Sequence, residues 1–201
     1  MEIKISKKPV KYEEAIEYLD ERVHQVSQNK NEELIWFLEH KSVYTCGVNF
    51  NQKDVLDKNV KIVKTNRGGK ITWHGPGQLI CYFVLDISKR KKDIRKFINS
   101  LEKSIMQFLK GYKIQSQNDK KNIGIWVKDK KIAAIGIRVS RWVAFHGCSI
   151  NISNNLNQYL KIIPCGLDNK KVTSIFNLIS VKPKKFENNL ANIFIKNINN
   201  I

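Results

Sequence analysis

Three β-type segments follow one another near residues 122–128, 131–139 and 142–152, with no helical pattern between them. All three are rich in Ile, Val, Phe or Trp, residue types that strands favour. Consecutive strands of this kind exclude the regular strand–helix alternation of a doubly wound fold. The middle of the chain is predicted to be mostly sheet, because further β-type segments lie near residues 33–39, 42–46, 60–65 and 79–87.

Helical patterns lie at both ends of the chain and in its centre. Apolar residues at three- and four-residue intervals predict one helix across residues 11–28 and a second from Ile94 to about Gly111. Shorter patterns predict helices within residues 172–179 and 190–198, before and after Pro183. The sequence therefore predicts an α+β fold, a mixed sheet flanked by helices, with residues 1–201 in a single domain.

The charge of the chain indicates an acidic partner without identifying it. Thirty-six Lys and Arg against eighteen Asp and Glu give a net charge of +18, which attracts nucleic acid or an acidic protein. An AT-rich coding genome is the competing explanation, since the chain is also rich in Ile and Asn. No zinc-finger spacing, helix-turn-helix signature or ribonucleoprotein motif accompanies the charge, so a basic nucleic-acid-binding protein is only a less favoured alternative function, and nucleic acid is not expected as a partner.

The lengths of the apolar runs and the spacing of the cysteines indicate where in the cell the protein is expected. The runs at residues 34–38 and 79–85 are far shorter than the roughly 18–20 residues that span a bilayer, and the N-terminus turns charged too early for a secretory signal. The four cysteines are widely scattered, with no C-x-x-C, which indicates neither a metal site nor a redox dithiol. We expect a cytoplasmic monomer that binds no metal and no membrane.

Residues 67–78, RGGKITWHGPGQ, combine four glycines with Arg67 and His74 at the approach to an apolar strand. Glycine allows positive φ angles and close approach of the backbone to a bound group, which favours a ligand-cradling loop. On composition alone, an ordinary glycine-rich turn with a hydrogen-bonded histidine is an equal alternative. Neither G-x-x-x-x-G-K-[ST] nor G-x-G-x-x-G occurs, so a nucleotide-binding loop is not supported.

This segment resembles the signature of the lipoyl(octanoyl) transferase family, in which R-G-G-x-x-T, an aromatic residue and H-G-P-G-Q lead into a strand. The resemblance continues through KKIAAIGIRVSRWVAFHGCSINI at 130–152 and IIPCGL at 162–167. It implies the fold of biotin and lipoate protein ligases and no cofactor. It also implies transfer of an octanoyl group from acyl carrier protein to a lysine of lipoyl domains, those of oxo-acid dehydrogenase E2 subunits and the glycine cleavage H protein.

The resemblance implies Cys165 as the nucleophile and Lys131 as its partner. Cys148 departs from the family pattern, in which an aliphatic residue is usual, and we expect it to line the site without taking part in the chemistry. The implied acyl-binding surface comprises Arg67, Gly68, Gly69, Lys70, Ile71, Thr72, Trp73 and His74, then Ala134, Ile135 and Gly136, and finally Gly147, Cys148 and Ser149.

A cysteine and a lysine can transfer an acyl group in two displacements without ATP. Thiolate attack on a thioester gives an acyl-enzyme, and the acceptor lysine then releases the acyl group as an amide. Lys131 is expected to accept a proton from the thiol and later from the acceptor amine. Without the family resemblance, this lysine would be one of many solvated ones.

Two points stay open at the level of sequence. The oxyanion donors are backbone amides either of residues 164–166 or of residues 67–70, and His74 is expected to support the loop rather than act as the base. An ATP-dependent lipoate ligase with a related glycine-rich loop is the alternative activity. The cysteine in IIPCGL and the HGPGQ ending favour the transferase.

Overall fold

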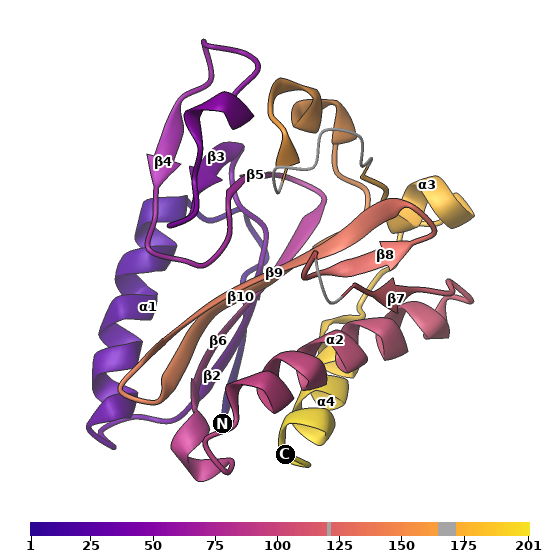
Figure 1. The fold of residues 1–201 in the computed structure, drawn as a ribbon. Helices are drawn as coiled ribbons and strands as arrows, with labels where there is room; N and C mark the ends of the chain where they lie inside the picture. The colour runs from indigo at the N-terminus through magenta and orange to yellow at the C-terminus, as the bar shows by residue number, and fades with distance from the viewer. Residues whose placement is uncertain (120–121, 165–171) are drawn as a thin grey trace.

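The computed structural model describes residues 1–119, 122–164 and 172–201, which build two β-sheets flanked by helices (Figure 1). The larger sheet has the order β1-β2-β6-β10-β9-β8-β7 and the smaller one the order β4-β3-β5. The pairs β1–β2 and β3–β4 are parallel, whereas the other described pairs are antiparallel. These mixed sheets confirm the predicted α+β fold.

The strands of the larger sheet are β1 (Glu2–Ile5), β2 (Leu34–Leu38), β6 (Gln78–Asp86), β7 (Gln117–Asn118), β8 (Ile125–Val127), β9 (Lys130–Ser140) and β10 (Val143–Asn151). The smaller sheet contains β3 (Val43–Cys46), β4 (Ile62–Lys64) and β5 (Ile71–His74). The helices are α1 (Tyr12–Ser27), α2 (Ile94–Gly111), α3 (Ile175–Ile179) and α4 (Glu187–Ile198), with short 3₁₀ turns η1 (Gln52–Asp54), η2 (Ile87–Lys89) and η3 (Leu156–Lys161).

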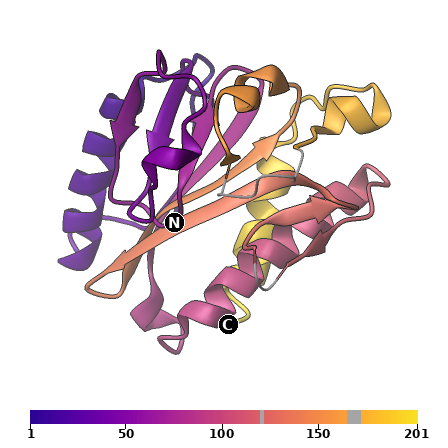
Figure 2. The same cartoon turned by 45° about the horizontal axis from the view of Figure 1, so that its top comes forward.

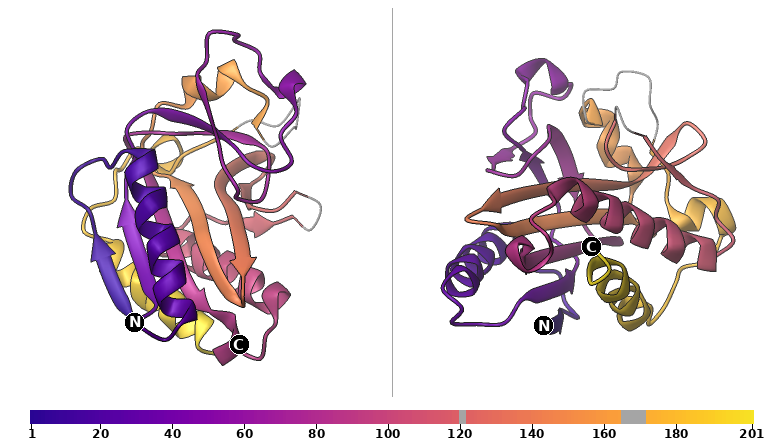
Figure 3. Two further views of the ribbon diagram at one scale, coloured as in Figure 1. Left: turned by 90° about the vertical axis from the view of Figure 1, so that its left-hand side faces the viewer. Right: turned by 60° about the horizontal axis from the view of Figure 1, so that its bottom comes forward.

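Strand β6 divides the apolar core into two layers. Its odd-numbered residues, such as Phe83, pack with α2 and α4, and Phe83 lies edge-on to Phe194 with ring centroids 5.0 Å apart. Its even-numbered residues, such as Tyr82, pack with α1. The alternation follows from the period of two along a strand. Helices α1 and α4 therefore lie on opposite faces of the sheet, on either side of β1 and β2 (Figure 3).

The two long helices agree with the predicted patterns. Helix α1 buries one stripe of residues, including Leu19 and Val26, and α2 buries Phe97 and Leu101 among others. The Asp93 side chain accepts a hydrogen bond from the backbone of α2 and satisfies one of its free amides. None of the helices in the described ranges has the length and apolar character needed to cross a bilayer.

Three strands were not predicted: β1, β5 and β7. Strand β5 lies inside the segment that the glycines mark as a loop, and it pairs with β3 so that Trp73 is opposite Tyr44. Its short run of β-forming residues is too brief to stand out between two glycine clusters. The smaller sheet and η3 share a third apolar cluster that includes Ile71, Trp73 and Tyr159, and Figure 2 shows them side by side.

Candidate functional site

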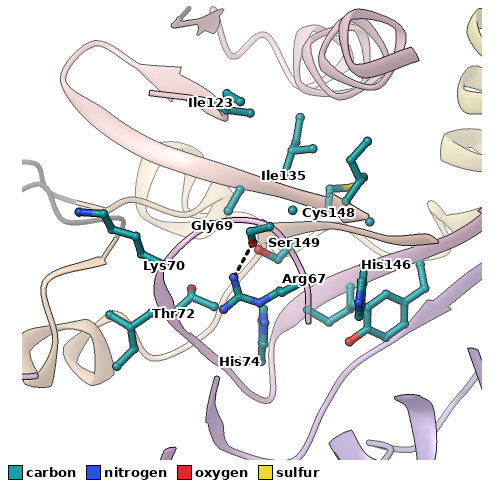
Figure 4. A pocket seen from close by; sticks show the side chains of 18 of the residues that line it. Arg67, Gly69, Lys70, Thr72, His74, Ile123, Ile135, His146, Cys148 and Ser149 are labelled. Carbon is teal, nitrogen blue, oxygen red and sulfur yellow. Dashed lines mark hydrogen bonds between the residues drawn. The ribbon is translucent and has the colours of Figure 1, made fainter. Parts of the chain in front are cut away.

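A cavity of about 370 Å³ lies between the loop of residues 67–70 and strands β9 and β10. The side chains around it converge from elements that are far apart in the sequence (Figure 4). Of the predicted site residues, those that line it are Arg67, Gly68, Gly69, Lys70, Ile71, Thr72, His74, Lys131, Ala134, Ile135, Gly136, Gly147, Cys148 and Ser149. Trp73 is absent from this lining because it packs against Tyr159 and donates to Ser42 Oγ.

The loop is held from behind by main-chain hydrogen bonds. Backbone amides of residues 47–49 donate to three carbonyl oxygens of residues 67–70, each over 3.1 Å. Gly47 allows this approach, because a Cβ atom there would overlap the carbonyl oxygen of Gly69. On the other side the loop rests on the sheet, where a Cβ at Gly136 would lie only 3.2 Å from Gly68 O. Glycine at these positions brings the loop and the sheet together.

Arg67 is fixed by acceptors from its own loop and from β3. Its Nη1 donates to Gly68 O over 3.0 Å, and its Nη2 donates to both oxygens of Thr45 over 2.9 Å. The guanidinium lies near the centre of the side chains drawn in Figure 4, beside His74. This arrangement places a permanent positive charge inside the cavity.

Lys131 is buried, with 8% of its surface exposed, whereas its neighbours Lys128 and Lys130 are exposed. Its Nζ donates to Ile123 O over 3.1 Å and lies 4.9 Å from the centre of the Trp126 ring. The two contacts fix the position of the amino group at the edge of the cavity. Lys131 is therefore set apart from the many solvated lysines of the chain.

Gly124 leaves the space that the Lys131 side chain occupies. A Cβ atom at this position would lie 3.0 Å from Lys131 Cε and 3.2 Å from its Nζ. The φ angle of Gly124 is +140°, which residues with side chains rarely adopt. The segment before β8 thus fits closely around the lysine.

His74 takes part in a buried network of side chains that links three strands and η3. Its Nδ1 lies 2.7 Å from Gln78 Oε1, and Gln78 Nε2 donates to Asn151 Oδ1 and to the Tyr159 hydroxyl. Because the Gln78 oxygen can only accept, Nδ1 of His74 carries the proton. Burial lowers the pKa of His74 to about 3, so its ring is neutral at physiological pH. The geometry suits a role in bracing the loop.

Two further histidines, which the sequence analysis did not single out, are also neutral. His40 Nε2 lies 2.8 Å from the Tyr82 hydroxyl, and burial lowers the pKa of His40 to about 4. His146 Nε2 lies 2.7 Å from Asn66 Oδ1, and burial, with the charge of Arg67, lowers the pKa of His146 to about 4. The signal that could have identified both histidines is their position within or just after an apolar run of the sequence.

The predicted nucleophile Cys165 lies outside the described residues. The described residues on either side of it, Pro164 and Val172, line a small recess together with Lys131. Backbone contacts hold this region, since Thr173 N donates to Lys131 O over 2.9 Å and Ile163 N donates to Asp54 O over 2.7 Å. Both described flanks of the predicted nucleophile are therefore tied to the region of the cavity.

In residues 1–119, 122–164 and 172–201, no group of three or more His, Cys, Asp or Glu side chains is placed to hold a metal ion. The chemistry available in the described site is that of a buried lysine, a guanidinium, neutral histidines and backbone amides.

The fold is similar to that of lipoate protein ligases. A bi-partite lipoate protein ligase from Thermoplasma acidophilum superposes with a TM-score of 0.66 over 100% of this chain and 83% of that chain, at 13% sequence identity. The profile of the lipoyl protein ligase A/B catalytic domain matches residues 11–195. The chain belongs to this family, and the predicted family and ligase-like fold are confirmed.

Within this family, the chain is similar in sequence to octanoyltransferases. An octanoyltransferase from Bartonella tribocorum is 43% identical over 192 residues, which cover 89% of this chain and 78% of that protein. The octanoyltransferase of Wolbachia sp. subsp. Brugia malayi is 40% identical over 198 residues, which cover 96% of this chain and 97% of that protein.

Proposed function

We propose that this chain is an octanoyltransferase of protein lipoylation, which acts in the cytoplasm. The observation that carries the proposal is the 40% identity to an octanoyltransferase over nearly the whole length of both chains. The donor is octanoyl-acyl carrier protein. The acceptors are lysines of lipoyl domains, those of oxo-acid dehydrogenase E2 subunits and the glycine cleavage H protein.

In this mechanism Cys165 attacks the donor thioester, and Lys131 acts as the general base. The first displacement exchanges one thioester for another, and the second forms a more stable amide, so neither needs ATP. The Ile123 carbonyl and the Trp126 ring orient the Lys131 amine. Lys131 accepts the thiol proton in the first step and the acceptor amine proton in the second.

The acyl chain occupies the cavity between the glycine loop and the sheet. Gly136 and Gly147 are opposite each other in β9 and β10. Because neither has a side chain, this part of the cavity wall consists of backbone and leaves room for the acyl chain. Ile80 and Ile135 supply apolar surface. Such a cavity suits a chain of methylene groups better than a nucleotide.

The loop amides are the proposed oxyanion donors. Three loop carbonyls accept hydrogen bonds from residues 47–49, whereas the amides of Gly68, Gly69 and Lys70 donate to no other backbone group within the described ranges. A run of such amides can stabilise a developing negative charge. This arrangement supports the glycine loop as a source of the donors.

Incubation with octanoyl-acyl carrier protein in the absence of acceptor tests the proposal. Peptide mapping should find one octanoyl group on Cys165, labile to hydroxylamine and absent from Cys165→Ala. Addition of a lipoyl domain without ATP should then move the group to the domain. Transfer that requires ATP and persists in Cys165→Ala would identify a ligase instead, and a label on Cys148 would overturn the assignment of the nucleophile.

A further inference from the structure

Two cysteines that are far apart in the sequence are opposite each other in the larger sheet. Cys81 on β6 pairs with Cys148 on β10 in the antiparallel register. Directly opposed residues in such pairs have Cα atoms about 4.5–5.5 Å apart, which lies within the range that a disulfide spans. Both side chains belong to the apolar cluster on the face of α2 and α4.

The two thiols differ in access. Cys81 is fully buried in the core beneath α2 and α4, and Cys148 is 4% exposed and lines the cavity. Figure 4 shows Cys148 beside Ile135, among the side chains that surround the cavity. A small molecule in the cavity therefore contacts Cys148 and not Cys81.

We propose that Cys81 and Cys148 form a dithiol that a hydroperoxide, entering through the acyl cavity, oxidises to a disulfide. The peroxide transfers one oxygen to the Cys148 sulfur, which becomes a sulfenic acid, and leaves as an alcohol or water. The Cys81 sulfur then attacks the Cys148 sulfur and releases water, so two thiols are oxidised for each peroxide reduced. Cys148 lines the cavity and Cys81 does not, so the peroxide reacts with Cys148 and Cys81 resolves the intermediate.

The disulfide would alter the wall of the cavity. It would draw two Cβ atoms from about 5 Å to about 3.8 Å, and β10 would shift toward β6. The neighbouring Gly147 cannot absorb this movement, because its backbone is already so close to Cys81 O that a Cβ would overlap that atom. The consequence for acyl binding rests on the proposed function, whereas formation of the disulfide does not.

The test uses the full chain with Cys165→Ser, which removes the predicted nucleophile as a competing thiol. Hydrogen peroxide is added, and proteolytic peptides are mapped without reduction. We expect one cross-linked peptide that joins Cys81 to Cys148 and disappears with dithiothreitol, while Cys46 stays free. Cys148→Val in the same background should give no cross-link. Mapping of the unsubstituted protein provides the same readout if either variant fails to fold.

A second measurement separates this inference from the proposed function. Octanoate, added before peroxide, should slow formation of the cross-link several-fold, and the oxidised protein should bind octanoate more weakly than the reduced one. Peroxide treatment that leaves Cys81 and Cys148 as free thiols would overturn the dithiol. If octanoate does not change the rate of cross-linking, the acyl chain does not bind beside Cys148. That result would leave the proposed octanoyl transfer untouched, because transfer is assayed separately.

Discussion

The two faces of strand β6 are packed in different ways. On the face of α2 and α4, Phe83 meets Phe97 and Phe194 in a closed apolar layer. On the face of α1, Tyr82 meets His40 and lines the cavity, which continues to Cys148 and Ile135 at the edge of the first layer. The first face has apolar contacts whose main effect is on stability. The second has buried polar groups and empty space, both of which cost stability unless a ligand or a network satisfies them.

This contrast explains where chemistry is possible in the molecule. Apolar layers close without gaps, whereas a site needs polar groups that are held in place but remain accessible. Along β6 the alternation of side chains keeps the two requirements apart, whereas on β10 Cys148 belongs to the apolar layer and also lines the cavity. Changes on the α1 face and at the cavity should therefore affect transfer more than stability, and changes on the other face should do the reverse.

The largest expected effect is that of Lys131→Arg on transfer. Arginine keeps the positive charge but cannot accept a proton, so kcat/KM for octanoyl transfer should fall by about 10²–10⁴. Because the larger side chain must fit beside Gly124, transfer is compared per folded molecule, with the melting temperature measured in parallel. Lys128→Arg and Lys130→Arg are the matched controls, because both lysines are exposed, and both should stay near native. Near-native transfer by Lys131→Arg would contradict its role in proton transfer.

The opposite effect is expected of Phe194→Ala on the closed face. The change removes a fully buried ring from the layer with Phe83 and should lower the free energy of unfolding by about 3 kcal/mol, as measured by denaturant titration. Transfer per folded molecule should be nearly unchanged. Phe176→Ala is the control, since Phe176 on α3 is 48% exposed and should cost little. A large loss of kcat with no loss of stability would break the comparison.

Acid should lower the stability of the fold through three buried histidines. The pKa values of His40, His74 and His146 are lowered to about 4, 3 and 4 in the folded chain, so the unfolded chain binds their protons first. The resulting stability is complete above the unfolded value near 6.5 and is lost as the pH falls toward the folded values. Between pH 6.5 and 5 each histidine should remove about 1–2 kcal/mol.

Denaturant titrations at several pH values measure this effect. His40→Gln should flatten the decline by the contribution of one histidine, because glutamine takes up no proton. Phe194→Ala should lower the whole curve and leave its slope unchanged, since it removes no titrating group. An equal slope in His40→Gln and the unsubstituted chain would contradict the buried neutral state of His40.

The smallest effect concerns salt. If the net charge of +18 steers acidic protein substrates, kcat/KM for them should fall several-fold as ionic strength rises, while turnover of a small octanoyl thioester changes little. Parallel assays with both donors over a salt series make the measurement. Equal responses would favour a compositional origin of the charge.

The sequence predicted the parts of the molecule that depend on local pattern. The periodicity of α1 and α2 and the apolar character of β6 identify these elements because each buries a regular stripe of residues. The glycines of the loop and the position of Lys131 came from a family resemblance. Their assignment to the reaction stays a prediction, although the structure brings both to one cavity.

The sequence patterns did not predict which distant strands, and which of their residues, pair in the sheets. Nothing in the spacing of Cys81 and Cys148 indicates a dithiol, because their proximity depends on the register of two strands. The same holds for His40 and Tyr82, which meet only after β2 and β6 pair. Strand β5 was missed because its four residues lie between two glycine clusters, and only its pairing with β3 shows it to be a strand.

The loop that forms one wall of the cavity is held by backbone atoms of residues 47–49, so different side chains can occupy part of this segment without altering the wall. Val48 is 66% exposed, and its hydrogen bond to the loop uses only its amide. Gly47 has no such freedom, because any side chain there would collide with Gly69. These two neighbouring positions both hold the loop, but they should evolve at very different rates. Substitutions at Val48 should leave the cavity unchanged, whereas almost every substitution at Gly47 should disrupt it.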